Sequence, residues 1–120
     1  MTLSQEQLNF FDTFGYLLIR QLFSPDELGK IIEGFEWSIQ NCGGGKNHNG
    51  TSRTMFLKPI EHTPEMSAIL DHPSILSLIG GILGEDFNYA GGDGNYYSGN
   101  TGWHPDGSRG NFLLPRQLSI

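Results

Sequence analysis

The sequence predicts an α+β fold in which helices pack on an incomplete antiparallel sheet. Helical signals, namely capping residues followed by apolar side chains three or four positions apart, occupy most of residues 1–85. Short β-type runs separated by glycine-rich turns occupy residues 86–120. Helices followed by strands are typical of α+β chains, whereas a parallel α/β sheet requires the two to alternate. With 120 residues, the chain is expected to form one domain with a buried core.

Capping residues mark two helices near the N-terminus. Ser4 begins a capping-box pattern and Gly15 provides a left-handed stop, which together predict a helix over residues 4–14. Ser24, followed by proline and two carboxylates, predicts a second helix over residues 25–40. The apolar face of the second helix is expected to belong to the core and comprises Leu28, Ile31, Ile32, Phe35 and Ile39.

The segments around these helices are interpreted from their composition. Residues 16–20 form a short apolar run that predicts a buried strand. Residues 41–50 are rich in glycine and asparagine and predict a mobile loop near the entrance of a site. Residues 52–60 suit a strand that is ended by a proline.

The second half of the chain continues with two helices and several short strands. Proline after Thr63 and after His72 predicts helices that end near Leu70 and Gly84. The later elements are expected at residues 86–90 (strand), 91–94 (turn), 95–98 (strand) and 111–120 (a last strand).

Composition excludes several classes of protein. Thirteen acidic residues against seven lysines and arginines give a net charge of −6, without the basic cluster that nucleic-acid binding requires. No apolar run approaches the ~20 residues of a membrane span, and the polar N-terminus is unlike a secretory signal. Cys42 is the only cysteine, so an internal disulfide and a multi-cysteine zinc module are excluded. We therefore expect a cytoplasmic protein that binds neither nucleic acid nor membrane.

The strongest candidate for a chemical site is His104-Pro105-Asp106. Residues i and i+2 of a strand project to the same side, so this imidazole and this carboxylate can converge on one metal ion. They correspond to two members of the 2-His-1-carboxylate triad that holds Fe(II) in non-haem oxygenases. A His-x-Asp pattern arises by chance in roughly one such chain in five, so its context must support it.

Other interpretations of these and the remaining histidines stay open. The stretch Trp-His-Pro-Asp-Gly is also a turn sequence, and its histidine and aspartate could form an adventitious zinc or nickel site. His62 and His72 lie beside helix-starting prolines and are expected on the surface or at N-caps. His48 lies in a glycine-rich loop from which it could reach a metal ion.

Several stretches follow one another in an order that matches a known family. They are Leu3-Ser4-Gln5-Glu6-Gln7, Phe14-Gly15-Tyr16-Leu17-Leu18-Ile19, Phe23-Ser24-Pro25-Asp26-Glu27-Leu28, His72-Pro73, Leu78-Ile79, Leu83-Gly84-Glu85-Asp86 and Trp103-His104-Pro105-Asp106. In this order and spacing the chain resembles the phytanoyl-CoA dioxygenase family of Fe(II)- and 2-oxoglutarate-dependent oxygenases. The resemblance covers nearly the whole chain.

The resemblance implies a double-stranded β-helix, or jelly-roll, with helices packed outside it, of which this chain forms part. It also implies oxidative decarboxylation of 2-oxoglutarate, coupled to hydroxylation of a small-molecule substrate. By position in the family pattern, His104 and Asp106 would be iron ligands. Asn95, Tyr97 and Lys58 are the candidates for binding 2-oxoglutarate.

The chain departs from the family pattern downstream of the motif. Members of the family carry a distal histidine as third iron ligand and an arginine that binds 2-oxoglutarate. No histidine follows Asp106, and neither Arg109 nor Arg116 can be matched to that arginine. This departure predicts a truncated product, with its reading frame lost near Gly110, that is inactive as 120 residues. The alternative is a non-catalytic interaction module that self-associates through an unpaired sheet edge.

Overall fold

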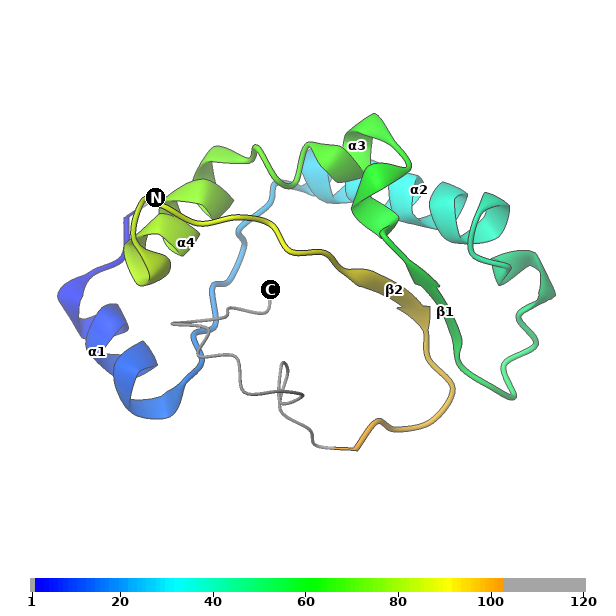
Figure 1. The fold of residues 1–120 in the computed structure, drawn as a ribbon, viewed down its shortest axis with the longest axis horizontal. Coiled ribbons are helices and arrows are strands. Elements are labelled where there is room, and N and C mark those ends of the chain that lie inside the picture. Colours follow the sequence, from blue (N-terminus) through cyan, green and yellow to red (C-terminus); the bar gives the residue numbers. More distant parts are fainter. Residues whose placement is uncertain (1, 103–120) are drawn as a thin grey trace.

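The computed structural model describes residues 2–102. The helices are α1 (Gln5–Phe14), α2 (Pro25–Asn41), α3 (Pro64–Ser67) and α4 (Pro73–Leu83), and the strands are β1 (Thr54–Leu57) and β2 (Asp93–Tyr96). Two 3-10 turns, η1 (Gly45–Asn47) and η2 (Pro59–Glu61), flank β1. In Figure 1 these elements follow an arc, with α1 and α4 at one end and α2, α3 and the β1–β2 pair at the other. Within the described range, no helix combines the length and apolarity needed to cross a bilayer.

The capping pattern around Ser4 produces α1 as predicted. The Gln7 amide donates to Ser4 Oγ (3.2 Å) and the Ser4 amide donates to Gln7 Oε1 (2.9 Å), so both halves of the capping box form. Gly15 adopts a left-handed conformation (φ 76°) and donates its N–H to the Phe11 carbonyl at 2.7 Å. None of the ten residues of α1 is buried. Local hydrogen bonds rather than burial therefore define this helix.

A second capping box, at Ser24, begins α2, and the helix has nearly the predicted bounds. Only the later part of its predicted apolar face is buried. Ile39 is inaccessible to solvent, whereas Leu28 and Ile32 are about half exposed. The prediction of a fully buried face is therefore wrong for the first turns. The close contacts of α2 with α3 and with the sheet lie at Gly34 and beyond.

The strands β1 and β2 pair antiparallel, in register from Thr54 opposite Tyr96 to Leu57 opposite Asp93. Helices together with this small antiparallel sheet confirm the predicted α+β class. The strand expected over residues 52–60 is shorter than predicted, because only its central four residues find partners on β2.

One face of the sheet is covered by α2. The ring centroid of Phe35 lies 6.2 Å from that of Phe56 and 6.1 Å from that of Tyr96. At Gly94, a Cβ atom would lie 2.7 Å from ring atoms of both phenylalanines, so this contact requires glycine. A packed cluster of aromatic side chains therefore lies between α2 and this face of the pair.

A close approach joins α2 to α3. Thr63 caps α3 by accepting a hydrogen bond from the Met66 amide at 3.2 Å, and the Met66 side chain is buried. A Cβ atom at Gly34 would lie 2.8 Å from Thr63 Oγ1, so glycine allows the two helices to approach. The helix α3 ends earlier than predicted and continues as turns over residues 68–71.

The helix α4 is capped by His72, whose Nδ1 accepts from the Ser74 amide at 3.2 Å, in agreement with the N-cap interpretation. Ile75 and Leu78 are buried on its inner face. Leu3 packs beside α4, close enough that a Cβ at Gly81 would lie 3.4 Å from its Cδ1. The N-terminal segment therefore lies against α4, as Figure 1 shows.

Three predictions in the extended segments are wrong. Residues 16–20 and residues 86–90 are not strands, because neither segment pairs with a described strand and a ladder requires a hydrogen-bonded neighbour. Residues 91–94 do not form a hairpin turn, because β2 begins at Asp93, earlier than predicted, and pairs with β1. The strand predicted over residues 111–120 lies outside the described residues.

Candidate functional site

The predicted iron ligands His104 and Asp106 lie outside the described residues. Beyond β2 the structure describes residues 97–102, which form neither helix nor strand. The strand β2 is therefore the last regular element that the structure describes before the His-x-Asp motif.

The face of the sheet that α2 leaves uncovered carries polar groups on β2. Because side chains alternate along a strand and Tyr96 faces α2, Asp93 and Asn95 project to the other side. Met55 and Leu57 lie on this same side of β1 and are exposed. We call these four side chains, Met55, Leu57, Asp93 and Asn95, the open face. It combines two apolar side chains with a carboxylate and an amide.

The amide of Asn95 is only partly satisfied. Its Nδ2 donates to Asp93 Oδ2 at 2.6 Å. Its Oδ1 is shielded from solvent and has no hydrogen-bond partner among the described residues. Such an acceptor costs about 1–3 kcal/mol when left unpaired, so buried polar atoms are nearly always paired with protein, water or a ligand. The open face therefore contains one shielded acceptor that has no hydrogen-bond partner among the described residues.

The other two candidates for binding 2-oxoglutarate, Tyr97 and Lys58, contact different residues. The Arg53 guanidinium lies 5.6 Å from the centroid of the exposed Tyr97 ring. Lys58 adopts a left-handed conformation (φ 63°) after β1, and its ammonium lies 3.6 Å from the Glu61 carboxylate. The described geometry thus does not bring Lys58 and Tyr97 together into one binding site.

Tyr96 connects β2 to α2 through two hydrogen bonds. Its hydroxyl donates to Glu36 Oε2 and accepts from Gln40 Nε2, the latter at 3.0 Å. Glu36 and Gln40 are four residues apart, so both project from the same side of α2. Burial, and then the hydrogen bond to Glu36, raise the pKa of Tyr96, which keeps the hydroxyl a neutral donor. Sequence analysis missed this contact, for which the only signal was the polar i, i+4 pair beside the apolar face of α2.

His48 lies against the same tyrosine. Its ring centroid is 5.1 Å from that of Tyr96, and its Nδ1 is 2.9 Å from Thr54 Oγ1. Both partners are on the face of the sheet that α2 covers. His48 therefore connects the predicted loop to both strands and lies on the opposite side of the sheet from the open face.

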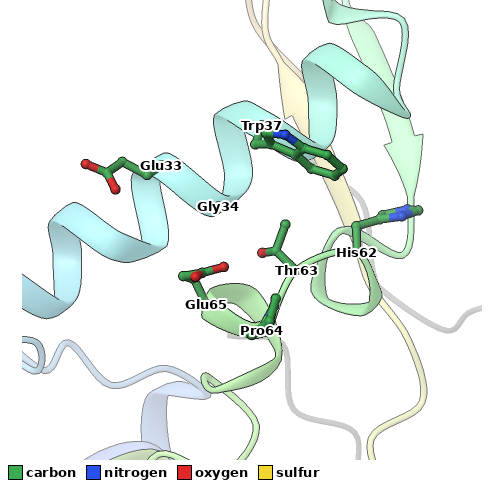
Figure 2. A pocket seen from close by; sticks show the side chains of 7 residues that line it. All are labelled: Glu33, Gly34, Trp37, His62, Thr63, Pro64 and Glu65. Carbon is green, nitrogen blue, oxygen red and sulfur yellow. The ribbon is translucent and has the colours of Figure 1, made fainter.

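A groove of about 390 Å³ lies between α2 and the segment that begins α3. Figure 2 shows Trp37 and His62 toward one end of it and Glu33 and Glu65 toward the other. The remaining lining residues are Gly34, Thr63 and Pro64. Neither carboxylate is paired with a cationic side chain of the described chain. An aromatic face beside carboxylates suits a cationic group, but no described contact links this groove to the open face.

Within residues 2–102, no three His, Cys, Asp or Glu side chains are grouped so that they could hold a metal ion. One pair of such side chains is in contact, because His72 Nε2 lies 3.3 Å from Glu27 Oε1. Since Nδ1 of the same ring accepts from a backbone amide, Nε2 carries the proton and donates to the carboxylate. Hydrogen bonds from the side chain and backbone of Ser24, followed by the one from His72, lower the pKa of Glu27 to about 2. This pair joins the N-termini of α2 and α4 and is structural.

The described residues do not by themselves form a site for 2-oxoglutarate. Its carboxylates require donors, yet the Asn95 amide donates to Asp93 and the Lys58 ammonium lies beside Glu61. The unpaired oxygen of Asn95 is an acceptor, so it cannot donate to a carboxylate either.

Comparison with known proteins adds no assignment to this geometry. The chain matches no family model, no curated protein and no solved structure.

Proposed function

We propose that this chain is part of an Fe(II)- and 2-oxoglutarate-dependent dioxygenase of the phytanoyl-CoA dioxygenase type, built on a jelly-roll core. In this proposal His104 and Asp106 are two of the iron ligands, and the substrate is a small molecule. The order of elements supports it: a capped helix, an extended apolar run, a second capped helix and a short antiparallel sheet precede the motif.

The observation that carries the proposal is the open face. Asn95 precedes His104 by nine residues, and its side-chain oxygen is shielded from water without a partner among the described residues. Since buried polar atoms are nearly always paired, an unpaired acceptor on this strand is expected where a ligand binds. The neighbouring Met55 and Leu57 are exposed apolar side chains that suit the C–H-rich substrate of a hydroxylase.

The residues of this chain have distinct parts in the proposal. Iron and 2-oxoglutarate supply the oxidising chemistry in enzymes of this class. His104 and Asp106 hold the metal ion, while Tyr96 positions β2 against α2. No histidine follows Asp106 in the sequence, and two ligands bind a metal weakly and with little selectivity. We therefore expect His104 and Asp106 alone to bind a metal ion only weakly.

Anaerobic calorimetric titration with Fe(II), in the presence and absence of 2-oxoglutarate, tests the proposal. Wild-type protein is expected to bind Fe(II), and 2-oxoglutarate should raise the affinity because it occupies positions that the protein leaves open. His104→Ala and Asp106→Ala should each weaken binding by about tenfold or more. His62→Ala, which changes an exposed histidine, is the control and should bind like wild type.

Two results would contradict the proposal in different ways. Equal Fe(II) binding by wild type and His104→Ala would show that the motif is not the metal site. Binding that requires both residues but is unchanged by 2-oxoglutarate would identify an adventitious metal site instead.

The second candidate function is a non-catalytic module that self-associates. Among residues 2–102, twelve large hydrophobic side chains are exposed, whereas six hydrophobic side chains are buried. Exposed apolar surface favours association with another chain where it is contiguous. This candidate predicts a concentration-dependent oligomer whose stability is unaffected by His104→Ala.

A further inference from the structure

A single imidazole, that of His72, joins the N-termini of α2 and α4. Its Nδ1 caps α4 by accepting from the Ser74 amide at 3.2 Å. Its Nε2 lies 3.3 Å from Oε1 of Glu27, which is in the first turn of α2. The ring of Phe23, the residue before the Ser24 cap of α2, lies 5.1 Å from the imidazole in an edge-to-face arrangement. In Figure 1 the segment that leads into α4 passes beside the start of α2. The side chain of His72 is 17% exposed, so the ring is largely enclosed between the two helices.

The two hydrogen bonds of His72 require the imidazole to be neutral. A neutral ring has one N–H and one lone pair, so Nε2 can donate to Glu27 while Nδ1 accepts from Ser74. An imidazolium carries an N–H at both nitrogens and has no acceptor. Protonation of Nδ1 would direct two N–H groups at each other, and the cap of α4 would be lost.

The first turn of α4 depends on this acceptor. Pro73, at the first position of the helix, has no N–H, so the Ser74 amide is the first donor of α4. In the described chain that amide donates to His72. Ile75, the next residue, is buried with 5% of its surface exposed. Loss of the cap therefore acts on a turn that contributes to the core.

We propose that protonation of His72 opens the first turn of α4, so that the start of this helix is a pH-sensitive switch. The imidazolium keeps its Nε2–H toward Glu27 and gains an ion pair there, while the Ser74 amide turns to solvent. The positive end of the α4 dipole also disfavours a cation at the cap. Histidine side chains change charge between about pH 5 and 8, so the switch operates in that range.

The carboxylate of Glu27 faces the imidazole and stays charged throughout this range. Its Oε2 accepts from the amide and the hydroxyl of Ser24, which leaves Oε1 for His72. Hydrogen bonds from Ser24, followed by the one from His72, lower the pKa of Glu27 to about 2. Asp26 on α2 and Asp71 before α4 are exposed, and neither forms an ion pair with a described residue. The imidazolium is therefore favoured by Glu27 and disfavoured by the N-terminus of α4.

Amide hydrogen exchange followed by NMR tests the switch, with each rate divided by the rate of an unfolded chain at the same pH. Between pH 8 and pH 5 the protection of the Ser74 amide should fall by about fivefold, the effect of losing one capping hydrogen bond. This fall should follow the titration of the His72 ring signals. The Glu27 amide, which donates to Ser24 in the other capping box, should keep its protection. Unchanged protection of the Ser74 amide between pH 8 and pH 5 would overturn the proposal.

His72→Asn separates the cap from its charge. Asparagine is a good N-cap residue and does not titrate, so the Ser74 amide should be equally protected at pH 8 and pH 5. His62→Asn, which replaces an exposed histidine, is the matched control and should keep the wild-type fall. A fall that persists in His72→Asn would overturn the proposal.

Glu27→Gln provides a second readout that leaves His72 in place. Glutamine keeps an acceptor for Nε2 but removes the charge that attracts the imidazolium. Opening of the α4 cap should then require a proton concentration about two- to fivefold higher than in the wild type. Opening at an unchanged or lower proton concentration would show that the imidazolium does not pair with Glu27, and would also overturn the proposal.

Discussion

The helices α1 and α2, at opposite ends of the arc, differ in what holds them. At the α2 end, Ile39, Phe56 and Met66 are buried between α2, the sheet and α3. At the α1 end, the helix α1 has a complete capping box and a left-handed stop, yet Phe14 and Tyr16 remain about 60% exposed. A ten-residue helix in isolation is marginal in water. Capping therefore defines where α1 begins and ends, while burial holds α2 in place.

This difference has a consequence for function. The strand that precedes the His-x-Asp motif belongs to the packed end, where Phe35 and the Tyr96 hydroxyl connect it to α2. A site that requires fixed geometry is best supported by such an element. The connection that follows α1, residues 16–19, forms neither helix nor strand.

The largest expected effect on the free energy of unfolding comes from truncating one phenylalanine at each end of the arc. Phe56→Ala deletes a ring that is 7% exposed and should lower the free energy of unfolding by about 3–5 kcal/mol. Phe14→Ala deletes a ring that is 61% exposed and that contacts Phe10 at a centroid distance of 4.6 Å. Its cost should be about 1 kcal/mol. Urea denaturation measures both, and equal losses would contradict the comparison.

Two glycines of α2 test, within one helix, the difference between a packed position and an open one. Gly34→Ala places a Cβ 2.8 Å from Thr63 Oγ1 and should destabilise the protein by about 1–3 kcal/mol. Gly29→Ala meets no atom within 4 Å and should stabilise the helix by about 0.5–1 kcal/mol. Thermal unfolding distinguishes the two. Stabilisation by both substitutions would mean that α3 does not pack closely on α2.

The hydroxyl of Tyr96 tests the connection of β2 to α2. Tyr96→Phe removes the hydrogen bonds with Glu36 and Gln40 and should cost about 1 kcal/mol. Amides of β2 should then exchange with solvent faster, while those of α1 should not change. Tyr97→Phe, at the exposed neighbouring ring, is the control and should have no measurable effect on either quantity. Unchanged exchange in Tyr96→Phe would show that the phenylalanine contacts alone hold the strand.

The smallest expected effect is on the pH dependence of stability. It concerns the two capping boxes, which use the neutral Gln7 in α1 and the charged Glu27 in α2. The pKa of Glu27 is lowered from 4.5 to about 2, so the folded protein binds this proton less tightly than the unfolded chain. The resulting stabilisation is complete above about pH 4.5 and is lost as the pH falls toward 2. Glu27→Gln should therefore flatten the pH dependence of the urea midpoint in this window. Gln7→Glu, the reverse change in α1, should add an acid-sensitive contribution of the same sign.

Features with local causes were predictable from the sequence. The capping residues Ser4, Ser24 and His72 placed α1, α2 and α4 within about one residue of their observed bounds. A cap depends on side chains within four positions of the backbone groups that it satisfies, so it can be identified from a short window.

Features that depend on distant partners were not predictable. Residues 16–20 have strand composition, yet β1 pairs with β2, where Gly94 allows Phe35 to approach. The hydrogen bond between Tyr96 and Glu36 joins residues 60 positions apart, which no local pattern encodes. For the candidate site, the sequence indicated His104 and Asp106 as ligands, but only the structure located the unpaired oxygen of Asn95.

Paramagnetic NMR titration with Mn(II) tests most directly whether the strand of the packed end leads to a metal site. We predict that amide signals broaden first around His104 and Asp106 and next at Asn95, that α1 is unaffected, and that His104→Ala abolishes the effect. Broadening centred on the groove between α2 and α3, or broadening that persists in His104→Ala, would contradict the account.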